Sequence, residues 1–303
     1  MGFNKNKIIA DILACPICHK GVELDSGVIF CSHCSKKFES RKGIPILFPG
    51  KPISDLSGEP SAHGSFKEKF RNTPIYPIVK SLSRLSPPDS SFVRRKSLDK
   101  QSSPSSIYVR KFVRSLGRDA LILDLGSDSR RISQEIIGLD IDLFSGVDVV
   151  GDAEALPFKN NSFDAVIIQD VLEHIPYPDK VASEIHRVLK KGGKVYADTP
   201  FIQVYHGSPK DYRRFTYEGH ETLFNKFKTV SLGVSTGPSS TFALTLRYYL
   251  ATLFSFNSSL LFTLWLNVFG WVTFPIKYLD FFLNDHKKAY LMASSTYYIG
   301  KKI

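Results

Sequence analysis

Four cysteines are the residues whose types and spacing point most directly to chemistry. They form two Cys-x-x-Cys pairs, Cys15 with Cys18 and Cys31 with Cys34, and twelve residues separate the pairs. Each pair lets two thiolates reach one ion, and a hairpin around residues 25–27 would fold the pairs together. Four soft thiolates select zinc, and a closed site of four cysteines is structural. An iron ion held by the same thiolates is the alternative.

A second set of polar residues follows four short apolar runs. The runs at 121–124, 135–139, 147–150 and 165–169 suit buried parallel strands. Ligands of such sheets bind outside the carboxyl ends of the strands, so the residues there should line one crevice. These candidate binding residues are Asp124, Gly126, Asp140, Asp152, Ala153, Gln169 and Asp170. Each carboxylate taken singly could instead serve a turn or a helix cap.

A third set gathers in residues 201–216, a segment expected to be a loop after a fifth strand at 194–198. His206 with Asp211 could act as a base and its orienting carboxylate. Arg213 or Arg214 could bind a phosphate or carboxylate of a substrate. His174, just after the fourth strand, is the other candidate base, or else packs in the following turn. The candidate substrate-binding residues are Tyr205, Tyr212, Arg213 and Arg214.

The elements that must position these residues alternate between strand and helix. Apolar stripes predict helices over residues 107–116 and 180–189, around the strands named above. This alternation predicts an α/β fold, a Rossmann-like, doubly wound and mostly parallel sheet. Residues 294–301 are strand-like and are expected to form an antiparallel edge strand.

In this order, the motifs LILDLG, GDAEALPFKNNSFDAVIIQD and LKKGG resemble those of class I S-adenosylmethionine (SAM) dependent methyltransferases of the type 11 group, over roughly residues 121–232. The resemblance implies that Asp140 binds the ribose hydroxyls of SAM and that Asp152 and Ala153 contact the adenine. It also implies that Gln169 and Asp170 border the methyl group.

The first loop departs from the family pattern of Asp-x-Gly-x-Gly-x-Gly. It reads Asp124-Leu-Gly-Ser-Asp-Ser, so two glycines are missing, and the stretch from Gly126 to Asp140 leaves little room for a first crossover helix. A degenerate relative that serves as a non-catalytic adaptor is therefore an alternative to an enzyme.

The sequence predicts three parts: a zinc ribbon over 1–50, a basic linker rich in proline and serine over 51–106, and a methyltransferase domain over 107–303. With LACPIC before it and GIPILFP after it, the ribbon resembles the small zinc-ribbon activators of RNA and protein methyltransferases. Docking of the ribbon on the adjoining domain is the corresponding hypothesis, and a bare folding module is the alternative.

Charge and hydropathy add a hypothesis about location. The net charge is +11, and residues 66–118 hold thirteen Lys or Arg against three acidic residues. Residues 241–283 are expected to form an apolar helical insertion, with no charged residue between Tyr248 and Ile276. Both features suit an anionic membrane surface. A solvated linker and a helical cap buried on the sheet are the alternatives.

The sequence thus predicts a cytoplasmic enzyme, working peripherally at the inner membrane surface, that transfers a methyl group from SAM to a small-molecule, glycan or lipid-linked acceptor. Methylation of RNA or of a translation protein is the alternative activity. Nucleic acid is the less favoured partner, because the basic segment lacks the interleaved aromatic residues of a single-strand groove. Cysteines confined to residues 15–34 suit a reducing compartment. The oligomeric state is not indicated.

Overall fold

The structure is a computed structural model that describes residues 5–25, 27–49, 104–128, 131–207 and 210–303. Most of the predicted basic linker over 51–106 lies outside the described residues. The helix expected over residues 107–116 is α4, which spans Pro104–Arg114 and so begins and ends slightly earlier.

One mixed sheet organises the described residues, with the order β1-β2-β3-β4-β7-β6-β5-β8-β9-β11-β10. The strands at its centre are β5 (Ile122–Leu125), β6 (Ile137–Asp140), β7 (Val149–Gly151), β8 (Phe163–Gln169) and β9 (Leu189–Pro200). All five pair in parallel, as the sequence predicts. The predicted Rossmann-like α/β fold is confirmed, and the four carboxyl-terminal ends with candidate ligands share one edge.

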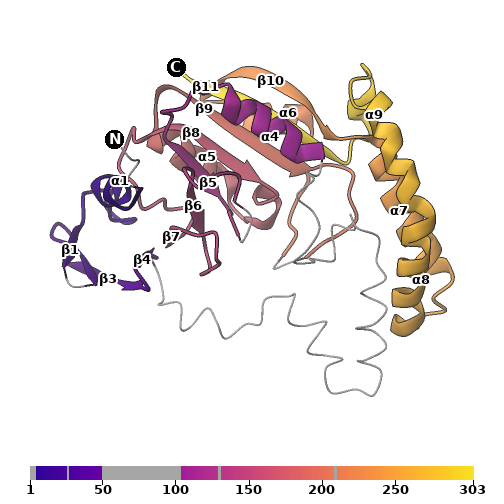
Figure 1. Ribbon diagram of the computed structural model, residues 1–303, viewed down its shortest axis with the longest axis horizontal. Coiled ribbons are helices and arrows are strands. Elements are labelled where there is room, and N and C mark those ends of the chain that lie inside the picture. The colour runs from indigo at the N-terminus through magenta and orange to yellow at the C-terminus, as the bar shows by residue number, and fades with distance from the viewer. Residues whose placement is uncertain (1–4, 26, 50–103, 129–130, 208–209) are drawn as a thin grey trace.

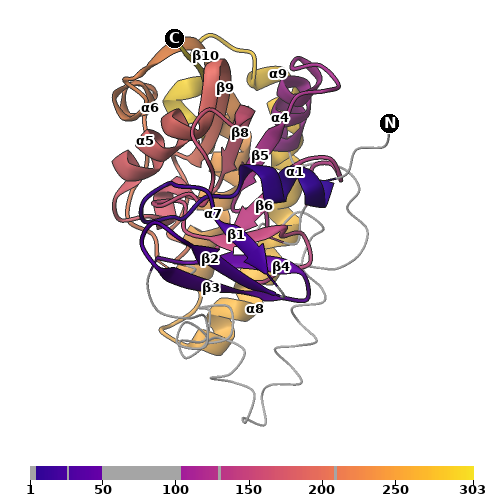
Figure 2. The same ribbon diagram turned by 90° about the vertical axis from the view of Figure 1, so that its left-hand side faces the viewer.

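Helices cover both faces of this central sheet, with α4 on one side and α5 and α6 on the other (Figure 2). Val109 and Phe112 of α4 pack with Ile167 and Tyr196 of the sheet. The opposite face is covered by α5 (Pro178–Val188), whose apolar residues join the main core, and by α6 (Tyr217–Leu223). Between β5 and β6 the described residues contain no helix, as the short spacing predicts.

The antiparallel end of the sheet corrects one expectation. Strand β11 (Ser295–Lys302) is antiparallel as predicted, but it lies between β9 and β10 and is not the edge. The edge strand is β10 (Phe227–Thr236), which the sequence analysis did not predict. Tyr298 of β11 is fully buried between its neighbours, as suits an inner strand.

The cysteine-containing module is continuous with the sheet. Helix α1 (Lys5–Ile12) precedes the strands β1 (Glu23–Asp25), β2 (Val28–Cys31), β3 (Lys36–Arg41) and β4 (Ile44–Leu47). Strand β4 pairs in parallel with β7, with Ile46 opposite Val150 and Leu47 opposite Gly151. Lys5 of α1 forms an ion pair with Asp148 at 2.6 Å. The backbone hydrogen bonds between β4 and β7 confirm the hypothesis that the ribbon docks on the adjoining domain.

The apolar insertion is a helical pair at the side of the sheet (Figure 1). It comprises α7 (Pro238–Leu253) and α8 (Ser259–Thr273), followed by the 3-10 helix η3 (Phe274–Leu279), α9 (Asp280–Leu283) and the 3-10 helix η4 (Ala289–Met292). The carboxylate of Asp280 accepts hydrogen bonds from the Ser239 and Ser240 amides at 2.7 and 3.0 Å. Because those amides lie in the first turn of α7, this contact caps α7 and ties α9 to its start.

We predict that Leu47→Ala destabilises the whole sheet, not only the ribbon. Leu47 is fully buried in the main core, so truncation should lower the free energy of unfolding by about 2–5 kcal/mol. Denaturant unfolding followed by circular dichroism measures this loss. The control is Leu24→Ala in the same module, where the side chain is 50% exposed and the change should be within about 0.5 kcal/mol. Equal effects of the two substitutions would contradict the shared core.

Candidate active site at the carboxyl edge of the sheet

The loop that follows β5 turns sharply at Gly126. This residue has φ +74°, a left-handed conformation that favours glycine. A Cβ atom placed there would lie 2.2 Å from the Val171 Cγ2 atom, so no larger residue fits beside the start of the loop after β8. Asp124 lies just before it, within β5, and is buried. Gly126 therefore allows the loop after β5 to pack closely against the loop after β8.

Asp140 ends β6 and fixes the shortened first loop. Its Oδ2 accepts a hydrogen bond from the Asp128 amide at 2.9 Å, and its Oδ1 accepts one from the Asp142 amide at 3.3 Å. Burial raises the pKa of Asp140, although both amide donors oppose the shift. The carboxylate predicted to bind a ribose diol thus also closes the loop in which the two glycines are missing.

The other predicted SAM ligands lie at the same edge, after β7 and β8. Asp152 directly follows β7 and accepts a hydrogen bond from the Glu154 amide at 2.8 Å, with the half-buried Ala153 between them. Gln169 ends β8, and Asp170 follows it with φ +52°. Parallel pairing therefore gathers the ends of β5, β6, β7 and β8, as the sequence predicts.

A buried carboxyl that the sequence analysis missed lies beside this edge. Asp198 of β9 is about 1% exposed and accepts hydrogen bonds from Ser235 Oγ at 2.8 Å and Tyr196 OH at 3.1 Å. Burial raises the pKa of Asp198 well above its usual range, and the charge of Asp170 raises it further. The signal that could have found it is an aspartate directly after three apolar residues, 195–197, in the fifth strand.

The structure brings the two predicted histidines together and adds a glutamate. The rings of His174 and His206 meet edge to face, with centroids 5.1 Å apart. Their Nε2 atoms lie 3.7 and 3.4 Å from Oε1 of Glu173, a fully buried residue that the sequence analysis did not select. The Glu173 carboxylate raises the pKa of His206. In the sequence, only the Leu-Glu-His motif after β8 indicated that Glu173 lies at this site.

Asp211 lies in this group and is held by Arg214. The guanidinium binds both carboxylate oxygens of Asp211 and lowers its pKa to about 2. Asp211 Oδ2 also accepts a hydrogen bond from the His206 amide at 3.0 Å and lies 3.6 Å from His206 Nδ1. The predicted pairing of His206 with Asp211 is present, and Arg214 has a partner within its own loop.

The remaining predicted substrate-binding residues are more dispersed. Tyr205 and Tyr212 are exposed on the same loop, and the Tyr212 amide donates to the Glu173 carbonyl at 2.8 Å. Arg213 donates to the Pro176 carbonyl at 2.7 Å. Arg213 thus links the loop after β9 to the loop after β8.

The four cysteines converge in the ribbon. Cys15 Sγ is 3.5 Å from Cys34 Sγ, and Cys18 Sγ is 3.5 Å from Cys31 Sγ. All four sulfur atoms lie within 4.8 Å of one another. Such separations suit tetrahedral ligation of one ion, because a thiolate lies about 2.3 Å from zinc.

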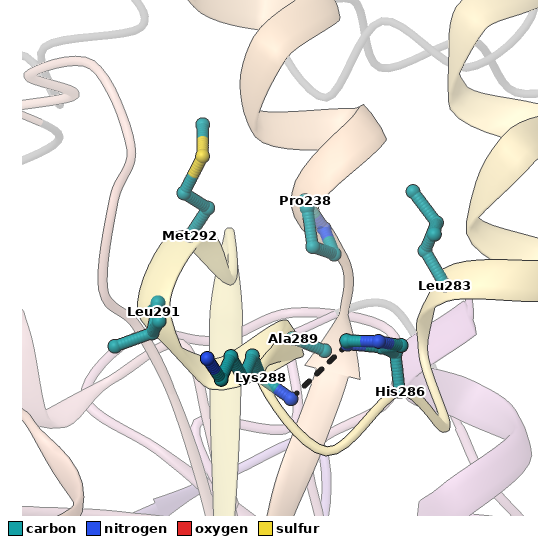
Figure 3. Close-up of a pocket in the computed structure, with 7 residues that line it drawn as sticks. All are labelled: Pro238, Leu283, His286, Lys288, Ala289, Leu291 and Met292. Carbon is teal, nitrogen blue, oxygen red and sulfur yellow. Dashed lines mark hydrogen bonds between the residues drawn. The ribbon is translucent and has the colours of Figure 1, made fainter.

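A small apolar pocket lies at the start of α7, between this helix and the segment that follows α9 (Figure 3). Pro238, Leu283, His286, Ala289 and Met292 are among its lining residues. Ala289 also packs near Phe201, the first residue of the loop that carries His206. The pocket therefore adjoins the end of β9, at the same edge of the sheet as the polar residues.

Comparison with known proteins agrees with this arrangement. A family model described as a methyltransferase domain matches residues 113–197, from the end of α4 to within β9. Residues 113–197 thus form a methyltransferase domain. The matched segment of this methyltransferase domain contains all the predicted SAM-binding residues and both Glu173 and His174.

Curated relatives match parts of the same domain. A ubiquinone/menaquinone biosynthesis C-methyltransferase of Brucella abortus is 37% identical over 101 residues, which is 32% of this chain and 37% of the relative. A demethylmenaquinone methyltransferase of Renibacterium salmoninarum is 51% identical over 47 residues, 16% of this chain and 20% of the relative. The chain thus spans between a fifth and little more than a third of the length of these relatives.

Solved structures show only distant similarity. A Haemonchus contortus phosphoethanolamine N-methyltransferase 2 bound to SAM has a TM-score of 0.42 at 18% identity, covering 78% of this chain and 60% of that one. The [4+2]-cyclase SpnF has a TM-score of 0.42 at 17% identity, covering 75% and 93%. Similarity at this level indicates neither the acceptor nor a partner.

We predict that Asp198→Asn stabilises the protein at neutral pH. Burial favours the protonated form of the native carboxyl, whereas the unfolded chain releases this proton above about pH 4, so the stability that the aspartate contributes is lost as the pH rises above that value. The gain should vanish below about pH 4, where both states are protonated. Urea unfolding across this pH range measures it. The exposed Asp119→Asn is the control, and an equal gain at every pH would contradict a protonated native Asp198.

Proposed function

We propose that this protein transfers a methyl group from SAM to a small-molecule, glycan or lipid-linked acceptor. The observation that supports the proposal best is the convergence of Asp124, Asp140, Asp152 and Asp170 at one edge of a methyltransferase domain. A ribose diol and an adenine amine both need acceptors such as carboxylates.

SAM would lie across this edge. Asp140 would accept from the ribose hydroxyls, and Asp152 and Ala153 would contact the adenine. The backbone at Gly126, with Asp124 behind it, would approach the methionine part, and Gln169 and Asp170 would border the sulfonium. SAM supplies an activated methyl group, so the protein contributes chiefly positioning and exclusion of water.

The acceptor would enter on the side of the loop that follows β9. His174, His206 and Asp211 lie close together and would handle the proton that a hydroxyl acceptor loses. Exposed Tyr205 and Tyr212, with the cations Arg213 and Arg214, would bind the rest of the acceptor. The names of the partial relatives support a small-molecule acceptor, because they denote methyltransferases of quinone biosynthesis.

The exposed apolar side chains of the helical pair support the proposal that the enzyme binds an anionic membrane surface on the cytoplasmic side. Residues 259–283 form one helical stretch that is long and apolar enough to cross a membrane by length and composition, and only 17% of its most apolar window is buried. Phe281 and Phe282 are 85% and 74% exposed, and Trp271 is 51% exposed. Such an unburied face suits interfacial insertion, which would bring a lipid-linked acceptor to the apolar pocket (Figure 3).

A structural zinc ion in the four-cysteine cluster completes the proposal. The ion would hold together the turn that precedes β1 and the turn that follows β2, and β4 connects this module to β7. Because Asp152 directly follows β7, the zinc would support the adenine end of the SAM site through the sheet.

We predict that the purified, zinc-loaded protein binds SAM and its demethylated product in a calorimetric titration. Asp140→Ala should weaken SAM binding by on the order of tenfold to a hundredfold, because a hydrogen bond to a charged group contributes about 1.5–3 kcal/mol. Asp142→Ala, two residues further on and exposed, is the matched control. A folded protein that gives no heat with either ligand would refute the enzyme and favour the adaptor.

We also predict that the full-length protein sediments with vesicles containing anionic lipid. Replacing Trp271, Phe281 and Phe282 together by serine should reduce the bound fraction at least about tenfold, since each removes exposed apolar area available for insertion.

The control replaces three exposed aliphatic residues away from the helical pair, Ile107, Ile141 and Val230, by serine. This variant should bind as the unsubstituted protein does. Equal loss in both variants, or no binding by the unsubstituted protein, would show that the helical pair does not dock on lipid.

A further inference from the structure

We propose that Glu173, His174 and His206 bind a divalent transition-metal ion. Two imidazole nitrogens and one carboxylate oxygen from these residues lie within 4.8 Å of one another. The two Nε2 atoms are 3.7 and 3.4 Å from the same oxygen, Glu173 Oε1. Ligands about 2.0–2.2 Å from a common ion lie roughly 3–3.5 Å apart in tetrahedral or octahedral geometry. The spacing is thus close to that of a metal site.

The burial of Glu173 favours a compensating cation. The residue is fully buried, and among the described residues no donor lies within ordinary hydrogen-bond distance of its carboxylate oxygens. An ionised carboxylate removed from water is costly unless it is paired or coordinates a metal. The two imidazole nitrogens lie 3.7 and 3.4 Å from Oε1, which is longer than an ordinary hydrogen bond. A cation between the three groups would satisfy the carboxylate.

Both imidazoles are oriented as metal ligands are. His174 Nδ1 contacts the Lys210 carbonyl, and His206 Nδ1 lies 3.4 Å from the Val204 carbonyl and 3.6 Å from Asp211 Oδ2. An imidazole bound to a metal usually donates its other nitrogen to a carbonyl or carboxylate in this way. Nε2 of each ring is then the nitrogen that faces Glu173.

The surrounding charges permit a cation. Arg214 Nη2 lies 3.4 Å from His206 Nδ1, but its guanidinium is bound by both oxygens of Asp211. That pair is close to neutral as a unit, which leaves the charge of Glu173 to attract the ion. Mixed imidazole and carboxylate ligands suit zinc and its neighbours in the first transition row better than calcium or magnesium.

The position of the cluster suggests what the ion would do. Glu173 and His174 follow β8, and His206 lies in the loop after β9, so the ion would sit beside the edge where the methyl group is expected. Three protein ligands leave a coordination position open. If the proposed methyl transfer is correct, an acceptor hydroxyl bound at that position would release its proton to water more readily, and the ion would replace His174 and His206 in the role of bases.

The test counts metal ions in the full-length protein. After dialysis against zinc, the unsubstituted protein should hold one equivalent more than Glu173→Gln or His206→Gln. The control is His286→Gln, which removes an exposed histidine outside the cluster and should keep the full content. Cobalt substitution separates the two sites, because only the four-cysteine site gives thiolate-to-cobalt charge transfer.

Equal metal content in the unsubstituted protein and in both folded variants would overturn the proposal, and would leave Glu173 as an acid–base partner of His206. The thermal midpoint and circular dichroism spectrum of each variant establish that it is folded, and His174→Gln serves if another variant fails to fold. The SAM titration is read separately. Extra metal without SAM binding would keep the metal site and refute methyl transfer.

Discussion

The parallel pairing of β4, β7, β6, β5, β8 and β9 is the constraint on which the rest of the structure depends. Parallel strands end at the same edge, so residues far apart in sequence meet there without further specification. Asp140, Asp152 and Asp170 lie at the carboxyl edge of the sheet for this reason. Glu173 and the loop with His206 lie there too. Because β4 extends the parallel set, the cysteine module is held by the same backbone hydrogen bonds as the site.

The parts predictable from sequence were those with a short-range signal. Two Cys-x-x-Cys pairs predict convergence because each pair is local and a hairpin joins them. Continuous apolar runs predict the central strands because a strand buried on both faces has little room for polar residues. The residue after each run then has its place assigned by topology alone, which is why Asp140 and Asp152 lie where they were expected.

Features that depend on contacts distant in sequence were missed. Glu173 looks like one residue of a turn until the loop after β9 brings His206 to it, 33 positions further on. Asp198 gains its donors from Tyr196 and from Ser235 on a strand that was not predicted. The inner place of β11 also has no local signal, because either order of the last two strands satisfies the same antiparallel pattern. The domain boundaries and the roles of individual site residues stay predictions.

The inner position of β11 has a consequence for synthesis on the ribosome. Strand β10 is made some sixty residues before β11, yet it joins the sheet only through β11. The strands β10 and β11 can therefore join the sheet only after residues 295–302 have emerged, and the apolar helices α7 and α8 emerge first. During that interval β9 has a bare edge and the helical pair has no finished sheet beside it, which is when aggregation or early capture by a bilayer competes with folding.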